Sequence, residues 1–253
     1  MDYLKHLLIR TPVEPVALNV RRLWTSFKLR KHPELREVFR EPELMDLVLA
    51  RVLARDSNCL DVGSHLGSML VRFLTFAPEG RHVAFEPTPV KARWLRSKFP
   101  EVHVEEVAAS DASGEATLFL NNRGSGLNSL RPQLGARPLV VRTARVDEFT
   151  SGPVSLMKID VEGGELAVMR GAAKTIDRCG PHLLFESTKS GHIAFGVSAD
   201  DVFDFLSGHE YSVFLLRDFL EDRPPLGKRS FREAHDYPFK AFNFFAVRRR
   251  PAA

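Results

Sequence analysis

The stretch "LMKIDVEGGELAVMRGA", residues 156–172, decides the fold class of this chain. A short apolar strand pattern runs into Asp160, Glu162 and a glycine pair, and a helical pattern begins at once. Lys158 and Asp160 are two residues apart, so both side chains fall on one face of the expected strand. Charge that is buried in a strand is costly unless it is paired or used. The stretch therefore predicts a strand-to-helix turn that carries a functional site.

The alternation of short apolar strands with helices extends on both sides of this stretch. Strands separated by helices of roughly 10 to 15 residues indicate βαβ units and a mostly parallel sheet, with ligands bound beyond the carboxyl ends of the strands. Residues 221–240 are expected to form a long polar loop, of the kind that often serves as a lid. The expected core strands are "NCLDVG" (58–63), "RHVAFEP" (81–87), "VHVEEVAAS" (102–110), "VSLMKID" (154–160), "PHLLFES" (181–187), "YSVFLL" (211–216) and "AFNFFAV" (241–247), with further β segments at "EATLFL" (115–120) and "PLVVRTARV" (138–146).

The first part of the chain has a different pattern. Its apolar residues recur at helical spacing, which predicts amphipathic helices. Pro33 and Pro42 each precede acidic residues, a combination typical of helix starts. We therefore predict two parts, an N-terminal helical segment over residues 1–56 and one catalytic domain over residues 57–253.

Composition places the chain among ordinary globular proteins. It is 44% hydrophobic and 27% charged over 253 residues, with a formal net charge of +4. The basic excess is concentrated in residues 21–31 and 248–250, and such clusters usually form a solvated face. We therefore expect no nucleic-acid partner, while weak peripheral contact of the basic N-terminal segment with a membrane stays open.

The cysteines and the lengths of the apolar runs indicate the cellular location of the protein. Cys59 and Cys179 lie in apolar contexts without metal-like spacing, which predicts reduced thiols rather than a disulfide. No apolar run reaches the length of about 18 residues that a membrane span needs, and residues 1–20 lack the apolar core of a signal peptide. We expect a cytoplasmic protein of undetermined oligomeric state.

Two acids follow consecutive expected strands. In "LDVGSHLG", Asp61 ends the first strand, and Gly63 and Gly67 allow the backbone to pass close to an anionic or polar ligand. His65 stands where a dinucleotide-binding fingerprint needs its second glycine, which argues against NAD. Glu86 ends the second strand, where a carboxylate can accept hydrogen bonds from both ribose hydroxyls. Together these signals predict a ligand that contains a nucleoside.

A third acid follows the next strand. Asp111, close to the backbone of Ala109, could accept a hydrogen bond from an adenine amino group. An Asp that simply forms a turn before "SGE" is an equal alternative.

The motifs together resemble a known family. "LDVGSHLG", "VAFEPTP", "VAASDASGEATLFL", "NSL", "MKIDVEGGELAVMRGA" and "PHLLFES" occur in the order found in the FkbM family of S-adenosylmethionine-dependent O-methyltransferases, over roughly residues 58–187. The resemblance implies an α/β class I methyltransferase fold: a Rossmann-like, seven-stranded, mostly parallel sheet with helices on both faces and the last strand antiparallel.

The resemblance also assigns roles to individual residues. His65 stands where the family usually has Asn, and Gly164 where it usually has Ala or another residue, so the role of His65 stays open. The implied cofactor contacts are Asp61, Gly63, Ser64 and Gly67 around the methionine part, Glu86 at the ribose, Ala109 and Asp111 near adenine, and Asp160 beside the sulfonium, with His65 and Pro87 as further contacts.

Methyl transfer to a hydroxyl needs an in-line geometry and a group that accepts the hydroxyl proton. We predict that Asp160 and Glu162 supply this group, that Lys158 orients the hydroxyl, and that Glu186 after the next strand is a second candidate. Asp160 and Glu186 could alternatively hold Mg²⁺, which we do not favour.

The acceptor is expected to be a sugar, a glycan or another polyhydroxylated small molecule. Polar side chains near the expected mouth of the site support this class, namely Asn128, Ser129, Lys189 and His192. The alternatives are N-methylation, a lipid or macrolide acceptor, and a catalytically inactive nucleoside-binding protein of the same fold.

Overall fold

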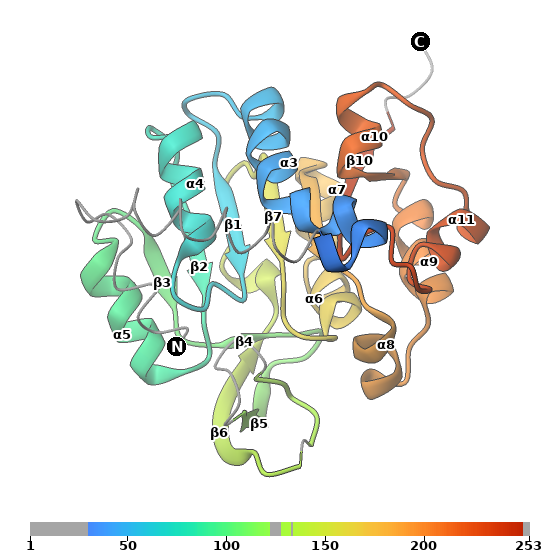
Figure 1. Cartoon of the computed structure of the whole chain (residues 1–253). Helices are drawn as coiled ribbons and strands as arrows, with labels where there is room; N and C mark the ends of the chain where they lie inside the picture. Colours follow the sequence, from blue (N-terminus) through green and yellow to red (C-terminus); the bar gives the residue numbers. More distant parts are fainter. Residues whose placement is uncertain (1–29, 122–127, 133, 250–253) are drawn as a thin grey trace.

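The computed structural model describes residues 30–121, 128–132 and 134–249. Its main sheet has seven strands in the order β3-β2-β1-β7-β8-β10-β9, and only β10 runs antiparallel to its neighbours among them (Figure 1). This is the predicted class I methyltransferase arrangement, and the predicted antiparallel last strand is confirmed. The strands are β1 (Cys59–Val62), β2 (Val83–Phe85), β3 (His103–Glu105), β7 (Leu156–Ile159), β8 (His182–Glu186), β9 (Tyr211–Leu215) and β10 (Asn243–Arg248).

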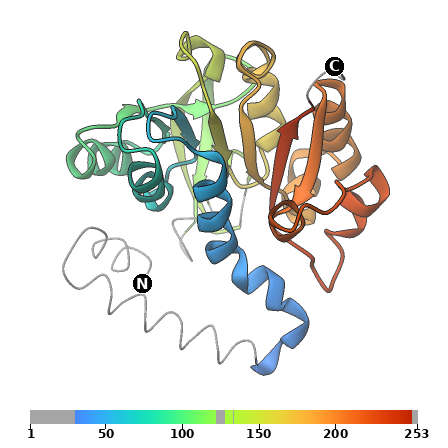
Figure 2. The ribbon, with the colours of Figure 1, turned by 90° about the horizontal axis from the view of Figure 1, so that it is seen from above.

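Helices cover both faces of this sheet, because successive side chains of each strand point to opposite sides. Figure 2 shows helices on both sides of the sheet. Leu184 and Phe245 belong to one buried cluster, whereas their chain neighbours Phe185 and Phe244 belong to the other. The cluster of Leu184 and Phe245 includes residues of α3 (Arg36–Val52), α4 (Ser68–Phe76), α5 (Pro89–Lys98) and α10 (Leu216–Leu220). The cluster of Phe185 and Phe244 includes residues of α6 (Glu165–Gly171), α7 (Ala173–Cys179), α9 (Ala199–Gly208) and α11 (Lys228–Glu233).

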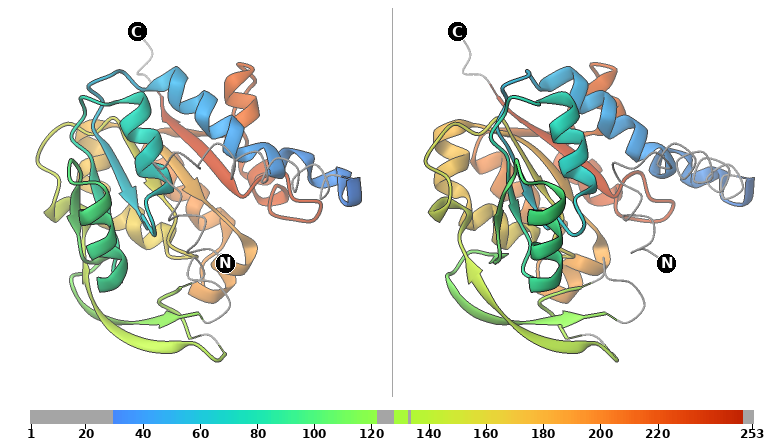
Figure 3. Two further views of the ribbon diagram at one scale, coloured as in Figure 1. Left: turned by 60° about the vertical axis from the view of Figure 1, so that its left-hand side comes forward. Right: turned by 90° about the vertical axis from the view of Figure 1, so that its left-hand side faces the viewer.

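A second, three-stranded sheet lies beyond the carboxyl ends of the main strands (Figures 1 and 3). Its order is β4 (Ala108–Ala109), β6 (Arg137–Ala144) and β5 (Gly114–Leu120). The expected single strand over residues 102–110 is therefore wrong. Its first half forms β3 in the main sheet and its second half forms β4 in the other sheet, because β4 pairs with β6 rather than with β2.

Three further predictions are corrected by the structure. Pro42 lies inside α3 instead of starting a helix, because the buried residues of that helix pack on the sheet and keep it continuous. The helix expected after Gly164 is two helices that meet at Ala172. The expected loop over residues 221–240 contains α11, whose Phe231 is fully buried, and a helix this short leaves little periodicity in the sequence.

The N-terminal prediction is only partly covered by the structure. The 3-10 helix η1 (Pro33–Leu35) and α3 fall within the predicted helical segment, whereas residues 1–29 lie outside the described residues. The boundary at residue 56 stays a prediction. No helix within residues 30–249, as far as the structure describes them, is long and apolar enough to cross a membrane.

Candidate active site

The turn from β1 into α4 packs directly against the end of β7. Gly63 has φ of +87°, and a Cβ atom there would lie 1.8 Å from the carbonyl oxygen of Asp160. The backbone N–H groups of Gly63 and Ser64 both donate to the carbonyl of Phe85, which joins the turn to β2. Gly67 also has positive φ, of +86°. Glycine is therefore required here by both conformation and close approach.

Asp61 is buried just beneath this turn, with 2% of its surface exposed. It pairs in register with Lys158 on β7, so the two side chains lie on one face of the sheet. Burial raises the pKa of Asp61 to about 7, although the Lys158 ammonium works in the opposite direction. Its Oδ2 atom has no hydrogen-bond partner among the described residues. A buried acceptor without a donor marks a place for a ligand donor.

Glu86 is held in position at the end of β2. One carboxylate oxygen accepts from the backbone N–H of His65 at 3.0 Å and the other from that of Thr88 at 2.9 Å. Burial raises the pKa of Glu86, and the nearby Lys91 ammonium opposes that shift. Each carboxylate oxygen can accept a further hydrogen bond, and Pro87 follows in the wall of the same cleft.

The structure places the two residues expected near adenine, Ala109 and Asp111, in different surroundings. Ala109 lies on β4 and lines the cleft together with Ala108 and Ser110. Asp111 is exposed, and it is not among the cleft-lining residues. The adenine role of Asp111 stays a prediction, and the cleft wall at this strand end is provided by the small residues that precede it.

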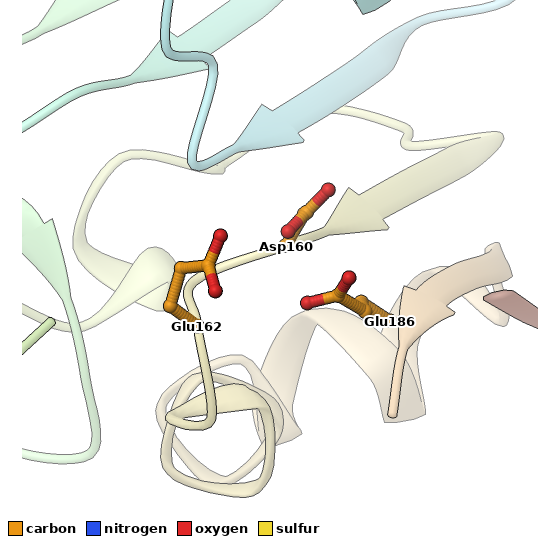
Figure 4. A group of neighbouring side chains, drawn as sticks. All are labelled: Asp160, Glu162 and Glu186. Atoms are coloured by element: carbon orange, nitrogen blue, oxygen red, sulfur yellow. The ribbon is translucent and has the colours of Figure 1, made fainter. Parts of the chain in front are cut away.

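Three carboxylates meet at the ends of β7 and β8. Asp160, Glu162 and Glu186 each place one oxygen within 4.8 Å of the others, and their side chains point toward one another (Figure 4). Lys158 donates to Asp160 with an Nζ–Oδ2 distance of 3.1 Å. The side chain of Lys158 is 5% exposed, whereas that of Asp160 is 41% exposed and so remains reachable from the cleft.

The charge state of this acidic trio (Asp160, Glu162 and Glu186) follows from burial. Burial raises the pKa of Glu162 to about 8, with further contributions from the neighbouring carboxylates of Asp160 and Glu165. Burial and the carboxylate of Asp160 likewise raise the pKa of Glu186 to about 9. Glu162 and Glu186 therefore hold protons at neutral pH, and the Lys158 ammonium balances the charge of Asp160. Carboxylates so close together avoid full ionisation in this way.

These elements surround one cleft of about 700 Å³, open solvent at its mouth included. Glu86 and Asp160 both line it, and Asp61 lies buried close enough for their charges to raise its pKa further. The residues of the predicted site that line the cleft are Gly63, His65, Glu86, Pro87, Ala109, Asn128, Asp160 and Glu162.

Sequence reasoning missed part of the lining. Lys91, in the first turn of α5, is buried in the cleft wall, where burial lowers its pKa and the carboxylates of Glu86 and Glu162 counteract the shift. Phe195, at the end of α8 (Lys189–Phe195), faces the cleft, and the guanidinium of Arg131 lies 4.9 Å from its ring centroid. Neither position belongs to a strand-end motif, so the sequence carries no signal for them.

The sequence profile of one protein family matches the part of the chain that lines the cleft. The profile described as "Methyltransferase FkbM domain" matches residues 61–213, from the buried acid of β1 to the middle of β9. The chain belongs to the FkbM methyltransferase domain family. The predicted resemblance is confirmed, and it extends further along the chain than the quoted motifs.

Individual relatives of this FkbM domain are distant. The AMB antimetabolite synthetase AmbE of Pseudomonas aeruginosa is 27% identical over 214 residues, which cover 67% of this chain. The match spans only 10% of the length of AmbE.

Two solved structures are similar to this chain at low sequence identity. A methyltransferase FkbM from Methylobacillus flagellatus is 14% identical with a TM-score of 0.48, covering 77% of this chain and 44% of that chain. An O-methyltransferase from Bacillus cereus, in complex with SAH (S-adenosylhomocysteine), is 14% identical with a TM-score of 0.44, covering 81% of this chain and 78% of that chain.

The four residues expected to bind the acceptor lie in different surroundings in the FkbM domain. Asn128 lines the cleft, and the buried hydroxyl of Ser129 donates to the carbonyl of Glu162 at 3.3 Å. Lys189 pairs with Asp236 at 2.7 Å on the surface. Residues 122–127, directly before Asn128, lie outside the described residues. The structure therefore gathers only the first two beside the cleft.

His192, the fourth, lies in a buried network instead. Its Nε2 atom is 2.8 Å from the Ser187 hydroxyl, which is 2.9 Å from Nε2 of His235. Nδ1 of His235 lies 2.8 Å from the carbonyl of Phe231, so this nitrogen carries the proton. The Ser187 hydroxyl must then donate to His235 and accept from His192. Burial lowers the pKa of His192 to about 4, with a further contribution from His235, so it is neutral at neutral pH.

Proposed function

We propose that this protein is an S-adenosylmethionine-dependent methyltransferase that transfers a methyl group to a hydroxyl of a sugar, a glycan or another polyhydroxylated small molecule in the cytoplasm. The observation that carries the proposal is the convergence of Glu86 and Asp160 on one cleft, beside a glycine turn, in a chain of the FkbM family.

The residues present fit the adenosyl cofactor. Glu86, already fixed by two backbone N–H groups, has free acceptor positions for ribose hydroxyls. The unpartnered Oδ2 of Asp61 suits a donor such as the cofactor's ammonium. The small residues Ala108 and Ala109 leave space for a flat adenine ring. When bound, the cofactor supplies an electrophilic methyl group on a positively charged sulfur.

The protein's own contribution to the reaction centres on the acidic trio. Asp160 is the carboxylate that can accept the acceptor's hydroxyl proton, because Glu162 and Glu186 are already protonated at neutral pH. Lys158 holds Asp160 in place by donating a hydrogen bond from its ammonium group to the Asp160 carboxylate. The protonated carboxyls of Glu162 and Glu186 can donate hydrogen bonds to neighbouring hydroxyls of the acceptor and so orient it.

The acidic trio also has the chemistry of a Mg²⁺ site. Mg²⁺ prefers carboxylate oxygens, and Asp160, Glu162 and Glu186 would hold it and orient the acceptor's oxygens. We favour the reaction without metal, because the Lys158 ammonium already pairs with Asp160 at 3.1 Å. Turnover that survives excess EDTA would remove the metal alternative, and loss of turnover restored by Mg²⁺ would establish it.

Binding of cofactor product tests the proposed function. Isothermal titration with SAH and, separately, with NADH should show saturable binding of SAH and none of NADH, as expected from a turn without the dinucleotide fingerprint. Binding of NADH instead of SAH would contradict the proposal. Binding of SAH without methyl transfer to any hydroxyl, amine, lipid or macrolide acceptor would instead identify an inactive nucleoside-binding protein.

A further inference from the structure

A second cavity opens next to the reaction centre, with a volume of about 810 Å³ that includes its open mouth. Its walls come from the first half of α3, from the end of β9 with the start of α10, and from the segment that leads into β10. β9 ends and β10 begins at the carboxyl edge of the parallel strands, which is also the edge of the acidic trio.

A row of polar residues connects the two cavities. The pairing that aligns Ile159 with Phe185 brings the next residues, Asp160 and Glu186, side by side, and Glu186 pairs in turn with Asn243 of β10. Residues paired directly across strands point to the same face of a sheet. Asp160 lines the first cavity and Asn243 the second, with Glu186 between them. Glu186 therefore lies on the strand between the two cavities, beside Asp160 on one side and Asn243 on the other.

The second cavity contains a built polar wall. Glu41, which is 5% exposed, accepts from the backbone N–H groups of Phe242 and Asn243 and from the Asn243 side-chain amide. That last bond fixes which end of the amide is oxygen, and the oxygen is buried without a partner among the described residues. An amide oxygen in this position calls for a donor, such as a hydroxyl.

The charges of the second cavity argue against an anionic occupant. Among the described residues, its walls hold three carboxylates, from Glu34, Glu37 and Glu41, and two cationic groups, from Arg217 and Lys240. Arg217 already pairs with Glu37 at 3.4 Å. A phosphate or carboxylate would therefore meet more like charge than opposite charge. The half-buried ring of Phe239 adds an apolar surface against which the C–H face of a sugar can pack.

The position of this cavity in the chain supports a role in specificity. Its lining residues lie at 34–44, 215–217 and 238–243, outside the segment 61–213 that matches the family profile. The cleft built around the glycine turn, by contrast, is lined by residues 63–195, within the match. The shared segment thus builds one cavity and the remainder of the chain builds the other.

We propose that the second cavity is the acceptor site, and that its acceptor is neutral and rich in hydroxyl groups, such as an unphosphorylated glycosyl unit. This inference rests on the proposed function. Phe239 packs against the sugar, the Asn243 amide oxygen accepts a hydrogen bond from one of its hydroxyls, and Glu186 orients a hydroxyl next to the one that Asp160 deprotonates.

Saturation-transfer NMR on the full chain with SAH present tests the inference. The probes are the methyl glycosides of glucose, galactose, mannose and rhamnose, with glucose 6-phosphate as the anionic comparison. At least one glycoside should bind, and Phe239→Ala should weaken it about five-fold, as the loss of an aromatic packing surface predicts. Ile193→Ala, at an exposed apolar site on α8, is the matched control and should leave glycoside binding unchanged.

Each outcome is decisive. Binding of none of the glycosides, or equal binding by wild type and Phe239→Ala, overturns the acceptor site. Preferential binding of glucose 6-phosphate that Lys240→Gln abolishes overturns the neutral acceptor. SAH affinity should be the same in every variant. A wild-type protein that fails to bind SAH contradicts the proposed function, whereas intact SAH binding with failed glycoside binding contradicts this inference alone.

Discussion

The cofactor side and the acceptor side of the carboxyl edge of the main sheet are built in different ways. On the cofactor side, polar groups are held by neighbouring strand-to-helix turns: Glu86 accepts from Thr88 in its own turn and from His65 in the turn after β1, 2 and 21 positions away in the chain. On the acceptor side, Glu41 bonds to Asn243, about 200 positions away, and Ser187 to His235, 48 positions away. The cofactor side is a set of local turns aligned by the sheet, and the acceptor side is an assembly of segments that meet only in the folded chain.

This difference has a functional consequence. A local turn keeps its geometry wherever its strand is placed, which suits a cofactor common to a whole family. A surface assembled from distant segments can change with any one of them, which suits an acceptor that differs between relatives. We therefore expect substitutions on the cofactor side to change SAH binding or turnover sharply, and those on the acceptor side to change acceptor binding and stability.

The largest effect is expected at the junction of the two sides. Asp160→Ala should lower turnover by roughly 10² to 10⁴, the usual contribution of general acid–base catalysis, because no other group of the acidic trio is ionised at neutral pH. SAH affinity should change little, and Glu79→Ala on the exposed surface is the control. Initial rates of methyl transfer measure the effect. A wild-type rate for Asp160→Ala would remove Asp160 from catalysis.

The next effect concerns the glycine turn. Gly63→Ala places a Cβ 1.8 Å from the carbonyl oxygen of Asp160 and forces a non-glycine residue to φ of +87°. The left-handed conformation alone costs about 1–2 kcal/mol, and the overlap adds to it. Thermal unfolding should show a large loss of stability, and SAH titration should show a large loss of affinity. Gly152→Ala, at a glycine with open space around its Cβ position, should show neither.

A smaller loss is expected at the ribose contact. Glu86→Ala should weaken SAH binding about 10- to 100-fold, since hydrogen bonds to charged groups contribute about 1.5–3 kcal/mol. Glu86→Gln keeps an acceptor for one of the two backbone N–H groups, so its SAH affinity should lie between those of Glu86→Ala and wild type. Calorimetry at fixed pH measures the affinities. Equal affinity for Glu86→Ala and wild type would show that Glu86 does not contact the cofactor.

The smallest effect concerns pH and belongs to the acceptor side. Burial lowers the pKa of His192 in the folded chain to about 4, below the ordinary 6.5 of a histidine, so at this residue the unfolded chain binds more protons between pH 4 and 6.5. The contribution of His192 to stability should therefore decrease by about 3 kcal/mol as pH falls from 6.5 to 4, while Asp61, Glu162 and Glu186, whose pKa values are raised, contribute in the opposite direction. His192→Gln should remove the His192 contribution, so its pH dependence in urea unfolding should differ from that of wild type, whereas exposed His103→Gln should follow wild type. Identical slopes for His192→Gln and wild type would contradict a buried neutral imidazole.

Some of the site could be predicted before the structure. The strand ends at Asp61, Glu86 and Asp160 follow apolar runs that can only be buried strands, and the glycines mark the turns. The pairing of Lys158 with Asp160 follows from the two-residue period of a strand. The switch of residues 108–109 into another sheet was missed, because strand pattern does not say which neighbour a strand will pair with.

The sequence by itself determined the class of the fold, the family and the acids at the strand ends, because these depend on periodicity and on residues close together in the chain. Only the tertiary structure decided that Glu162 joins Asp160 and Glu186, that His192 is buried beside His235, and that α3 and β10 enclose a second cavity. Such contacts depend on how distant segments pack against each other, and no local pattern of residues records that choice.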